Sequence, residues 1–373
     1  MDERELGYLL AVAAAGVWSP RAVSAWLNAL GTPRALVDYL RAGHERPPKG
    51  VEKLSDDARA RLSNIDDDAA RAALRAAASS RSRIVLRTDG SYPAALRDLC
   101  DAPLVLYVRG DLARVGERAV AIVGSRAATA YGRSVACAMA SEFAAFGATI
   151  VSGLARGVDA AAHRGALDAG TPTVAVLGSG VSALYPHYHA LLADEIVERG
   201  GAVVSEFAPA QAARAFQFPM RNRIVAALAQ ATVVVEASTR SGALITARLA
   251  DELGRSVFAI PGDVGRPTSA GTNALIADGV PLVTSAADIA ALVGWRCAIE
   301  QPRTSGAQDA VQSALLARLA EPQTVDELAA SSSATAAELS SQLVLLELRG
   351  LVERGPGGAY AAVRTGTAAK RGA

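Results

Sequence analysis

The sequence predicts an α/β protein: a parallel sheet flanked by a small helical domain before it and a winged helix after it. In the middle of the chain, β-branched runs alternate with helical stretches, as in a parallel sheet with crossover helices. Glycine-rich loops follow the first strands of that region, where the carboxyl edge of such a sheet forms a ligand crevice. Helical stretches and a glycine-turned hairpin close the chain.

Composition fits several domains and excludes a membrane span. The 373 residues leave room for two or three domains. Apolar residues make up 51% of the chain, but no apolar run reaches the roughly 18 residues of a membrane span. The charged start, Met1–Glu5, argues against a signal peptide. Cys100, Cys137 and Cys297 lack CxxC spacing and are expected as free thiols, so we expect a cytoplasmic protein.

Charge alone says little about the ligand. A net charge of +1 excludes a protein that coats nucleic acid through bulk electrostatics. Lysine occurs only at Lys49, Lys53 and Lys370, so the central region relies on arginine, which suits bidentate phosphate contacts and stacking. A composition biased toward Arg and Ala explains this excess more simply. The positions of the arginines therefore matter more than their number.

Residues 1–78 are expected to form a domain of short helices. Their apolar faces, or a capping Ser or Asp at their start, predict helices at 6–13, 20–30, 33–40, 55–62 and 66–78. The Ser- and Arg-rich block 79–83 is expected to be a linker.

The central domain, 84–296, carries the alternating pattern. Its expected strands are 119–123, 148–151, 173–176, 202–205, 231–236, 256–260 and 281–284. Its expected helices are 130–146, 159–169, 188–199, 220–229, 242–253, 272–278 and 286–293. Right-handed crossovers between parallel strands would place these helices over the sheet.

A polar linker, 297–308, is expected to separate this domain from a winged-helix domain, 309–365. That domain would hold three helices and a hairpin strand, at 309–319, 325–330, 336–349 and 359–363. Capping boxes at 324–327 and 335–338 would start the last two helices. The tail after 365 is expected to be disordered.

The third helix of the winged helix predicts no sequence-specific reading of duplex DNA. It would bury Leu339, Leu343 and Leu346, and it begins with Glu338. A helix that reads the major groove wants Arg, Lys or Asn near its start. We therefore expect this domain to have an auxiliary or protein-contact role.

Three glycine loops follow strands and indicate a phosphate-rich ligand. They are 123–126, 152–159 and 177–180. Glycine lets backbone N–H groups approach an anion, and helix N-termini favour negative charge. The candidate binding residues in the first two loops, both of which contain arginine, are Gly124, Ser125, Arg126, Gly153, Arg156 and Gly157.

The known nucleotide-binding loops are absent. The 123–126 loop is not followed by Gly-Lys-Ser/Thr, as in a Walker A loop, and it is not a GxGxxG fingerprint. Ser152 and Gly153 stand at the end of the second strand, where a dinucleotide site has an acidic residue. No cofactor is therefore expected.

The stretch 216–223 predicts a phosphate site with a stacking platform. Pro219 fits the first turn of a helix, so Arg221, Asn222 and Arg223 are expected in that turn, behind Phe218. Stacking of a base on an aromatic ring contributes roughly 1–3 kcal/mol whatever the base. The simpler alternative, a core Phe218 and a solvated arginine face, is less favoured beside the glycine loops. Ser241 and Gly242 start another helix at the same edge and add backbone donors.

Catalytic and metal sites are not expected. Asp159 and His163 lie four residues apart and could form an acid–base pair, but a capping Asp and a buried His are more common. His187 and His189 have no partners at metal-ligand spacing. No Ser, Cys or Lys stands in a nucleophile context, so the chain is not expected to be an enzyme.

Many separate motifs between 84 and 294 make the chain resemble the DprA/Smf family, the DNA-processing protein A of bacterial natural transformation. The matching stretches are 89–93, Leu96, Pro103, 106–107, 123–126, 131–132, 152–159, 162–163, 185–186, 205–206, 218–223, Glu236, 241–242, 261–262 and 271–273. The N-terminal block departs from the family pattern: members often carry Gly-x-Gly where this chain has Gly16, Val17 and Trp18.

The resemblance implies a Rossmann-like domain that binds single-stranded DNA in a positive pocket, after a SAM-like helical domain. It further implies a non-enzymatic mediator that works as a homodimer. Such a protein helps to load RecA onto incoming strands held by single-strand-binding protein.

Two other functions fit parts of the sequence. One is a nucleotide phosphoribohydrolase of the Lonely Guy type, but the Pro-Gly-Gly-x-Gly-Thr-x-x-Glu motif of those enzymes is missing at 261–265. The other is a winged-helix regulator with a ligand-sensing Rossmann domain.

Overall fold

A computed structural model describes residues 1–16, 20–44, 46–112, 118–297, 315–319, 321–331, 334–348, 352–355 and 358–362. The chain divides into two compact units, Met1–Ala298 and Ile299–Ala373. Of the expected features, most of the linker, the start of the 309–319 helix, the tail, and Val17 and Trp18 lie outside the described residues.

The N-terminal block is helical, as predicted. Its helices are α1 (Glu3–Ala14), α2 (Pro20–Leu30), α3 (Pro33–Arg41), α4 (Asp56–Ser63) and α5 (Asp67–Ser79). The side chains of Ser55 and Asp66 accept hydrogen bonds from backbone N–H groups at the starts of α4 and α5, which confirms both capping predictions. Trp26 and Leu36 are fully buried in the core of this block. Since α5 ends at Ser79 and the first strand begins at Arg83, the expected linker shrinks to 80–82.

The central sheet has eight strands in the order β1-β2-β6-β5-β4-β3-β7-β8. The strands are β1 (Arg83–Leu86), β2 (Val105–Gly110), β3 (Ala119–Val123), β4 (Thr149–Ser152), β5 (Thr173–Val176), β6 (Ala202–Ser205), β7 (Ala231–Val234) and β8 (Ser256–Ala259). The six strands from β6 to β8 pair in parallel, as predicted. Two strands that were not among those expected add an antiparallel edge, since β2 runs antiparallel to β6 and β1 antiparallel to β2. The segment between β1 and β2 contains only the single-turn helix α6 (Ala94–Arg97), not a long crossover helix.

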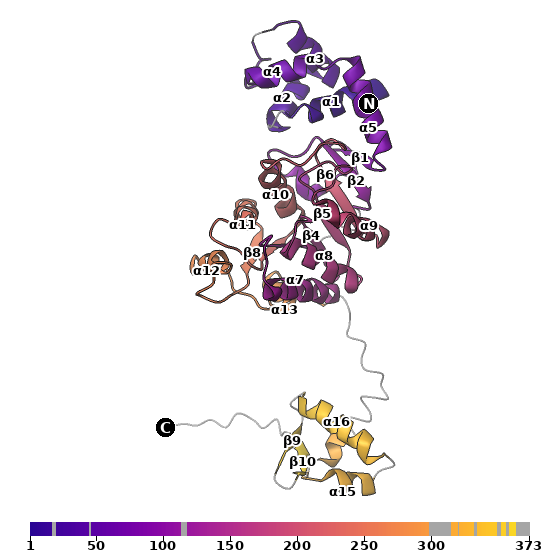
Figure 1. Ribbon diagram of the computed structural model, residues 1–373, viewed down its shortest axis with the longest axis vertical. Helices are drawn as coiled ribbons and strands as arrows, with labels where there is room; N and C mark the ends of the chain where they lie inside the picture. Colours follow the sequence, from indigo (N-terminus) through magenta and orange to yellow (C-terminus); the bar gives the residue numbers. More distant parts are fainter. Residues whose placement is uncertain are drawn as a thin grey trace. The chain divides into compact units, whose positions relative to one another are not determined.

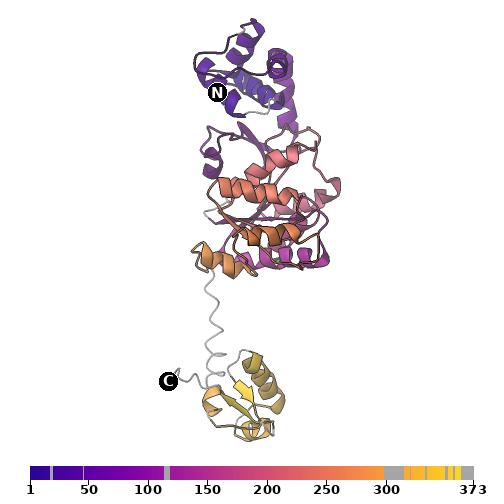
Figure 2. The same cartoon turned by 90° about the vertical axis from the view of Figure 1, so that its left-hand side faces the viewer.

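Helices cover both faces of this sheet (Figure 1). They are α7 (Ala130–Glu142), α8 (Val158–Asp168), α9 (Ala190–Glu198), α10 (Gln217–Leu228), α11 (Gly242–Glu252), α12 (Ala270–Ala277) and α13 (Ala286–Leu292). Successive residues of β3 show the two faces: Ala121 packs in the core under α10 and α11, and Ile122 packs in the core under α7, α8 and α13. Figure 2 shows α10 and α11 in front of the sheet.

The strand order reverses at the middle of the sheet. From β3, the chain adds β4, β5 and β6 on one side, and β7 and β8 then continue on the other side of β3. The carboxyl ends of β3 and β7 therefore border a topological switch point, where open α/β sheets bind their ligands.

Three expected elements differ in the structure. The strand expected at 281–284 is wrong, because only Leu282 bridges to Ala259 of β8. The helix expected at 130–146 ends at Glu142 and continues as a 3₁₀ turn, Phe143–Phe146. Helix α10 begins at Gln217, earlier than expected, and the fully buried Gln217 side chain accepts a 2.6 Å hydrogen bond from the Arg214 amide in the preceding loop.

The second unit is described only in part. It contains α15 (Val325–Ala330), α16 (Ala336–Leu348), β9 (Val352–Arg354) and β10 (Tyr360–Ala362), with β9 and β10 antiparallel. The capping box of Thr324 and Glu327 is confirmed. Leu339, Leu343 and Leu346 of α16 are buried, as predicted. These pairings give the helix-and-hairpin core of a winged helix.

Gly157 is expected to be irreplaceable. Its φ is +79°, and a Cβ at this position would stand 2.3 Å from the Ser125 carbonyl oxygen. Gly157→Ala should therefore lower the free energy of unfolding by clearly more than the roughly 1–2 kcal/mol expected from a left-handed backbone alone. Urea unfolding measures this difference.

Gly170→Ala is the matched control for that measurement. Gly170 has φ +69°, but a Cβ there would meet nothing within 4 Å. Equal losses for the two variants would show that contact with Ser125 is unimportant.

Candidate functional site

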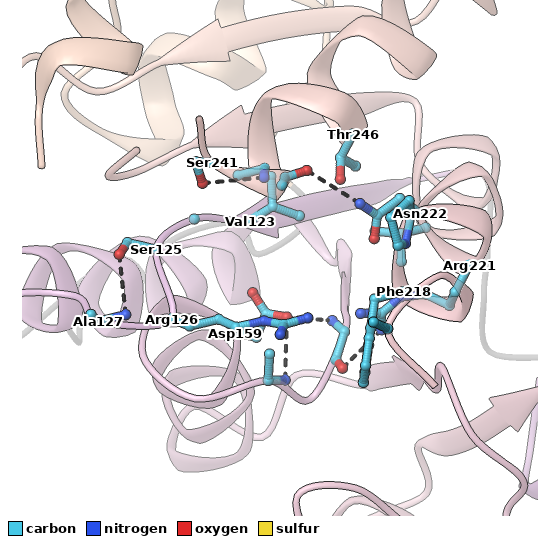
Figure 3. A pocket seen from close by; sticks show the side chains of 18 of the residues that line it. Val123, Ser125, Arg126, Ala127, Asp159, Phe218, Arg221, Asn222, Ser241 and Thr246 are labelled. Atoms are coloured by element: carbon cyan, nitrogen blue, oxygen red, sulfur yellow. Dashed lines mark hydrogen bonds between the residues drawn. The ribbon is translucent and has the colours of Figure 1, made fainter. Parts of the chain in front are cut away.

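A pocket of about 770 Å³ opens at the switch point of the sheet. It is bordered by the loops after β3, β4, β5, β6 and β7 and by the N-terminal halves of α10 and α11 (Figure 3). Nine of the twelve predicted site residues line it: Gly124, Ser125, Arg126, Gly153, Phe218, Arg221, Asn222, Ser241 and Gly242. Arg156, Gly157 and Arg223 are not among its lining residues.

The β3 and β7 loops are fastened to each other across the switch point. The Ser125 amide donates to the Glu236 carbonyl at 2.6 Å. The buried Glu236 carboxylate accepts hydrogen bonds from the Thr129 amide at 2.8 Å and from the Thr129 hydroxyl at 3.0 Å. The carboxylate packs directly against the backbone of Gly132, where a Cβ would stand 2.3 Å from a Glu236 carboxylate oxygen. Glu236 therefore fixes the loop and does not line the pocket.

Arg221 forms part of the pocket wall but is a buried residue. It is 3% exposed, and one guanidinium nitrogen donates to the Gly153 carbonyl at 2.8 Å and to the Val176 carbonyl. Burial lowers the pKa of Arg221 to about 10, with attraction to Asp159 opposing the shift, so the group stays charged at neutral pH. The expectation that Arg221, Asn222 and Arg223 lie in the first helical turn is wrong, because α10 already begins at Gln217.

His163 is buried and hydrogen-bonded, as predicted, but the prediction that Asp159 caps a helix is wrong, because Gly157 is the N-cap of α8 and no side chain caps that helix. Asp159 accepts hydrogen bonds from the amides of Gly153 at 3.1 Å and Ala155 at 3.3 Å, which shapes the loop after β4. Burial raises the pKa of Asp159, and attraction to Arg221 opposes that shift. His163 is fully buried, and its Nδ1 lies 2.7 Å from the Thr173 hydroxyl. Burial lowers its pKa to about 3, so His163 is neutral at physiological pH.

Arg223 is engaged in ion pairs beside the pocket. Its guanidinium bonds both carboxylate oxygens of Glu206, at 2.8 and 2.7 Å, and an Asp101 carboxylate oxygen at 2.7 Å. The side chains of Arg223 and Glu206 are 7% and 9% exposed. The predicted phosphate contact of Arg223 is therefore not supported by its position, because these carboxylates already occupy the guanidinium.

Arg126 and Phe218 meet inside the pocket. In Figure 3, Arg126 reaches from the β3 loop toward Phe218 on α10. Its guanidinium carbon lies 4.5 Å from the centroid of the Phe218 ring, within the range of a cation–π contact. Arg126 is exposed, and no described carboxylate forms an ion pair with it.

The opposite wall is built by the start of α11. The Ser241 side chain accepts a hydrogen bond from the Ala243 amide at 3.3 Å, and the Asn222 side chain donates to the Gly242 carbonyl at 3.2 Å. These contacts hold α10 against α11, so both helix starts border the pocket. A helix start of this kind favours an anion.

Sequence reasoning missed three residues at the pocket. Arg214 lies between Ala213 and Ala215, which line the pocket, and Arg240 lies between Ser238 and Ser241, which do the same. Both arginines are exposed. Tyr185 lines the pocket and is 48% exposed. An arginine among small loop residues at the carboxyl edge was the available signal for the first two.

Within the part of the chain that the structure describes, no group of three or more His, Cys, Asp or Glu could hold a metal ion. Among those same residues, no helix is long and apolar enough to cross a membrane. Within the described residues, Cys100, Cys137 and Cys297 form no disulfide.

Comparison with known proteins identifies the family. The family model of DNA recombination-mediator protein A matches residues 83–294, and that of the DprA winged helix domain matches 300–358. Protein Smf of Escherichia coli (strain K12) is 40% identical over 276 residues, which cover 72% of this chain and 74% of that protein. The chain belongs to the DNA recombination-mediator protein A family. The DNA processing protein DprA of Streptococcus pneumoniae (strain R6) is 42% identical over 207 residues, 54% of this chain and 71% of that protein.

Two solved structures of the family share this fold. DNA processing protein A of Streptococcus pneumoniae has a TM-score of 0.64 and 32% identity, covering 78% of this chain and 98% of that one. The Helicobacter pylori protein, whose structure addresses its single-stranded DNA binding mode, has a TM-score of 0.52 and 29% identity. The matched region covers 58% of this chain and 99% of the Helicobacter pylori chain. The predicted family and fold class are thus confirmed.

Arg223→Ala should destabilise the fold. Its removal leaves Glu206 buried without a counter-charge, which costs about 3–5 kcal/mol when one partner of a buried pair is lost. Urea unfolding should therefore show a much lower free energy of unfolding.

The double variant Arg223→Met with Glu206→Leu serves as the control. It removes both charges, so its loss of stability should be far smaller. If Arg223→Ala kept wild-type stability and lost DNA binding instead, Arg223 would belong to the binding site.

Proposed function

We propose that this family member is a recombination mediator that binds single-stranded DNA in the pocket at the switch point. The observation that carries the proposal is the pocket itself, which combines glycine loops, two helix starts and exposed arginines around an open crevice. The Helicobacter pylori relative supports it, since single-stranded DNA binding is described for that protein.

The phosphates would be held by the arginines at the pocket rim. Arg126, Arg214 and Arg240 come from three different loops, and all three are exposed. None of them forms an ion pair with a described residue. Because contacts to phosphates do not distinguish one base from another, binding should not depend on the DNA sequence.

The enzymatic alternative has little support from the pocket. Asp159 is the one carboxylate among the described residues that line the pocket, and it is buried, with its Oδ2 accepting hydrogen bonds from two loop amides. Glu236 faces Thr129 instead. A phosphoribohydrolase needs a carboxylate that reaches its substrate, so neither residue suits that role.

Further features of the proposed mediator come from the family resemblance. They are loading of RecA, action on strands held by single-strand-binding protein, a homodimer, natural transformation and a cytoplasmic location. The domain limits 1–78, 84–296 and 309–365 also stay predictions.

Replacing the three rim arginines tests the proposal. Arg126→Ala, Arg214→Ala and Arg240→Ala together should weaken binding of single-stranded DNA at least tenfold. Each lost phosphate contact should also reduce the slope of log affinity against log salt by about 0.7. Fluorescence anisotropy with an oligo(dT) probe at several salt concentrations measures both.

Arg75→Ala provides the control, because Arg75 is an exposed arginine on α5 of the helical block. It should leave affinity and salt slope unchanged. Wild-type binding by the triple variant would place the DNA elsewhere on the molecule.

The winged helix should be dispensable for single-strand binding. Truncation of the chain after Cys297 removes the winged helix. It keeps the hydrogen bond from the Arg118 guanidinium to the Arg296 carbonyl, which truncation after Trp295 would remove. The truncated protein should bind oligo(dT) within about twofold of the full chain, since the proposed contacts all lie in the first unit. Protection of one specific duplex sequence by the full chain but not by the truncated one would favour the regulator hypothesis instead.

A further inference from the structure

Two exposed arginines adjoin the loop after β3, residues 124–129, without lining the pocket. Arg126 of this loop points into the pocket, toward Phe218 (Figure 3). Arg133 lies near the start of α7, and Arg156 ends the loop after β4. Both of these are exposed, and neither is among the lining residues. The proposed pocket therefore leaves two accessible cations beside it without a role.

Contacts place both arginines against that loop. The Arg133 guanidinium donates to the Ala128 carbonyl at 2.5 Å. Arg156 is followed by Gly157, whose Cβ, if present, would stand 3.0 Å from the Arg126 carbonyl oxygen. The amide of Val158 donates to the Ser125 carbonyl at 3.3 Å. The loop thus lies between the pocket and these two arginines.

The packing of α7 on α8 brings Arg133 to the side on which Arg156 lies. The two helices follow the neighbouring parallel strands β3 and β4, and the Cys137 carbonyl lies so close to Gly165 that a Cβ there would overlap it. One helical turn earlier, α7 has Arg133 and α8 has Ala161. Arg133 is therefore near the start of α8, which Arg156 directly precedes.

No carboxylate among the described residues forms an ion pair with Arg133 or Arg156. The two carboxylates of this region, Asp159 and Glu236, are buried and engaged. Asp159 accepts hydrogen bonds from the loop after β4, and Glu236 accepts them from Thr129. Two exposed and uncompensated guanidinium groups on one surface favour a ligand with repeated negative charge.

Arginines in two other directions from the pocket are already compensated. Arg266 belongs to the loop that packs on Ser238 through Gly271, and it pairs with Asp263 at 2.7 Å. Arg109 pairs with Asp194 of α9 at 2.6 Å. A strand that left the pocket in either direction would meet cations whose charge is neutralised. The side of Arg133 and Arg156 differs in this respect.

We propose that Arg133 and Arg156 form a second phosphate-binding site, on which the DNA strand lies after it leaves the pocket across the 124–129 loop. This rests on the proposed function. A strand longer than the pocket has to leave it at some point of the rim, and arginines on both sides of one loop would hold successive phosphates. The site contacts only the backbone of the strand, so it adds affinity without reading bases.

Strand length separates this site from the pocket. The full chain is titrated with the shortest oligo(dT) that the wild type binds measurably, and with one of about 25 nucleotides, longer than a single-strand site of about 4–16 nucleotides. Arg133→Ala with Arg156→Ala should bind the short probe like the wild type. It should bind the long probe about tenfold more weakly, and the slope of log affinity against log salt should fall by about 0.7 for each arginine. Fluorescence anisotropy measures both quantities.

Arg156→Ala alone keeps the test independent of the loop, because Arg133 also holds the Ala128 carbonyl. It should weaken binding of the long probe about threefold and reduce the salt slope by about 0.7. Arg156→Lys keeps the charge and should keep the wild-type salt slope. Arg75→Ala, on α5, is the matched control and should bind both probes like the wild type. Thermal unfolding of each variant checks that the fold is kept.

Each contrary result has its own meaning. Wild-type binding of the long probe by the double variant, together with loss in the variant of Arg126, Arg214 and Arg240, overturns the second site and leaves the proposed function intact. An equal loss on the short and long probes also overturns it, because the two arginines would then act within the pocket. Absence of binding by the wild type to either probe overturns both proposals.

Discussion

The buried guanidinium of Arg221 is the contact on which the pocket depends. It donates to the carbonyls of Gly153 and Val176, which lie at the carboxyl ends of β4 and β5. Carbonyl groups at the end of a strand have lost their ladder partners, and leaving them buried without a donor is costly. Arg221 satisfies them and so fixes α10 against the sheet. Phe218 and Asn222, on the same helix, are thereby placed on the pocket wall.

This contact also explains a glycine. A Cβ on Gly153 would stand 2.3 and 2.4 Å from the two terminal nitrogens of Arg221. Gly153 is therefore required by a side chain of the protein itself, whereas sequence reasoning assigned it to the approach of a phosphate. Gly157, in the same loop, is required for a different reason, because its backbone has a φ of +79°. One glycine-rich loop thus meets two separate constraints, and neither of them needs a ligand.

Most of the fold could be predicted because the signals are local. The strand β3, for example, is a short buried run of apolar residues whose alternate side chains enter different cores. The carboxyl-edge loops followed from the strands, and nine of twelve candidate residues meet at one pocket. The antiparallel edge was not predicted, because β1 and β2 were not recognised as strands of the sheet, although the lack of a long helix between them fits an antiparallel pair.

Which arginines are buried could not be predicted either. Arg221 and Arg223 lie two residues apart in one helix and have the same neighbour, Asn222. Their roles are decided by distant partners: Asp101, which pairs with Arg223, is 122 residues away in sequence. Arg214 and Arg240 lie in loops without periodicity, so only their place among small loop residues at the carboxyl edge marked them. Arg221 and Arg223, which the sequence predicts as phosphate ligands, are buried. Arg214 and Arg240, which it does not predict as ligands, are exposed.

This arrangement reconciles a nearly neutral chain with a phosphate site. The charge of Arg223 is compensated by Glu206 and Asp101, and that of Arg221 is partly compensated by Asp159. The field at the mouth of the pocket must then come from exposed arginines and helix starts, which act locally and are screened by salt. Phosphates are common to single and double strands, so such a field cannot tell them apart. Preference for a single strand has to come from the bases, which are free to stack on an exposed ring only when they are unpaired.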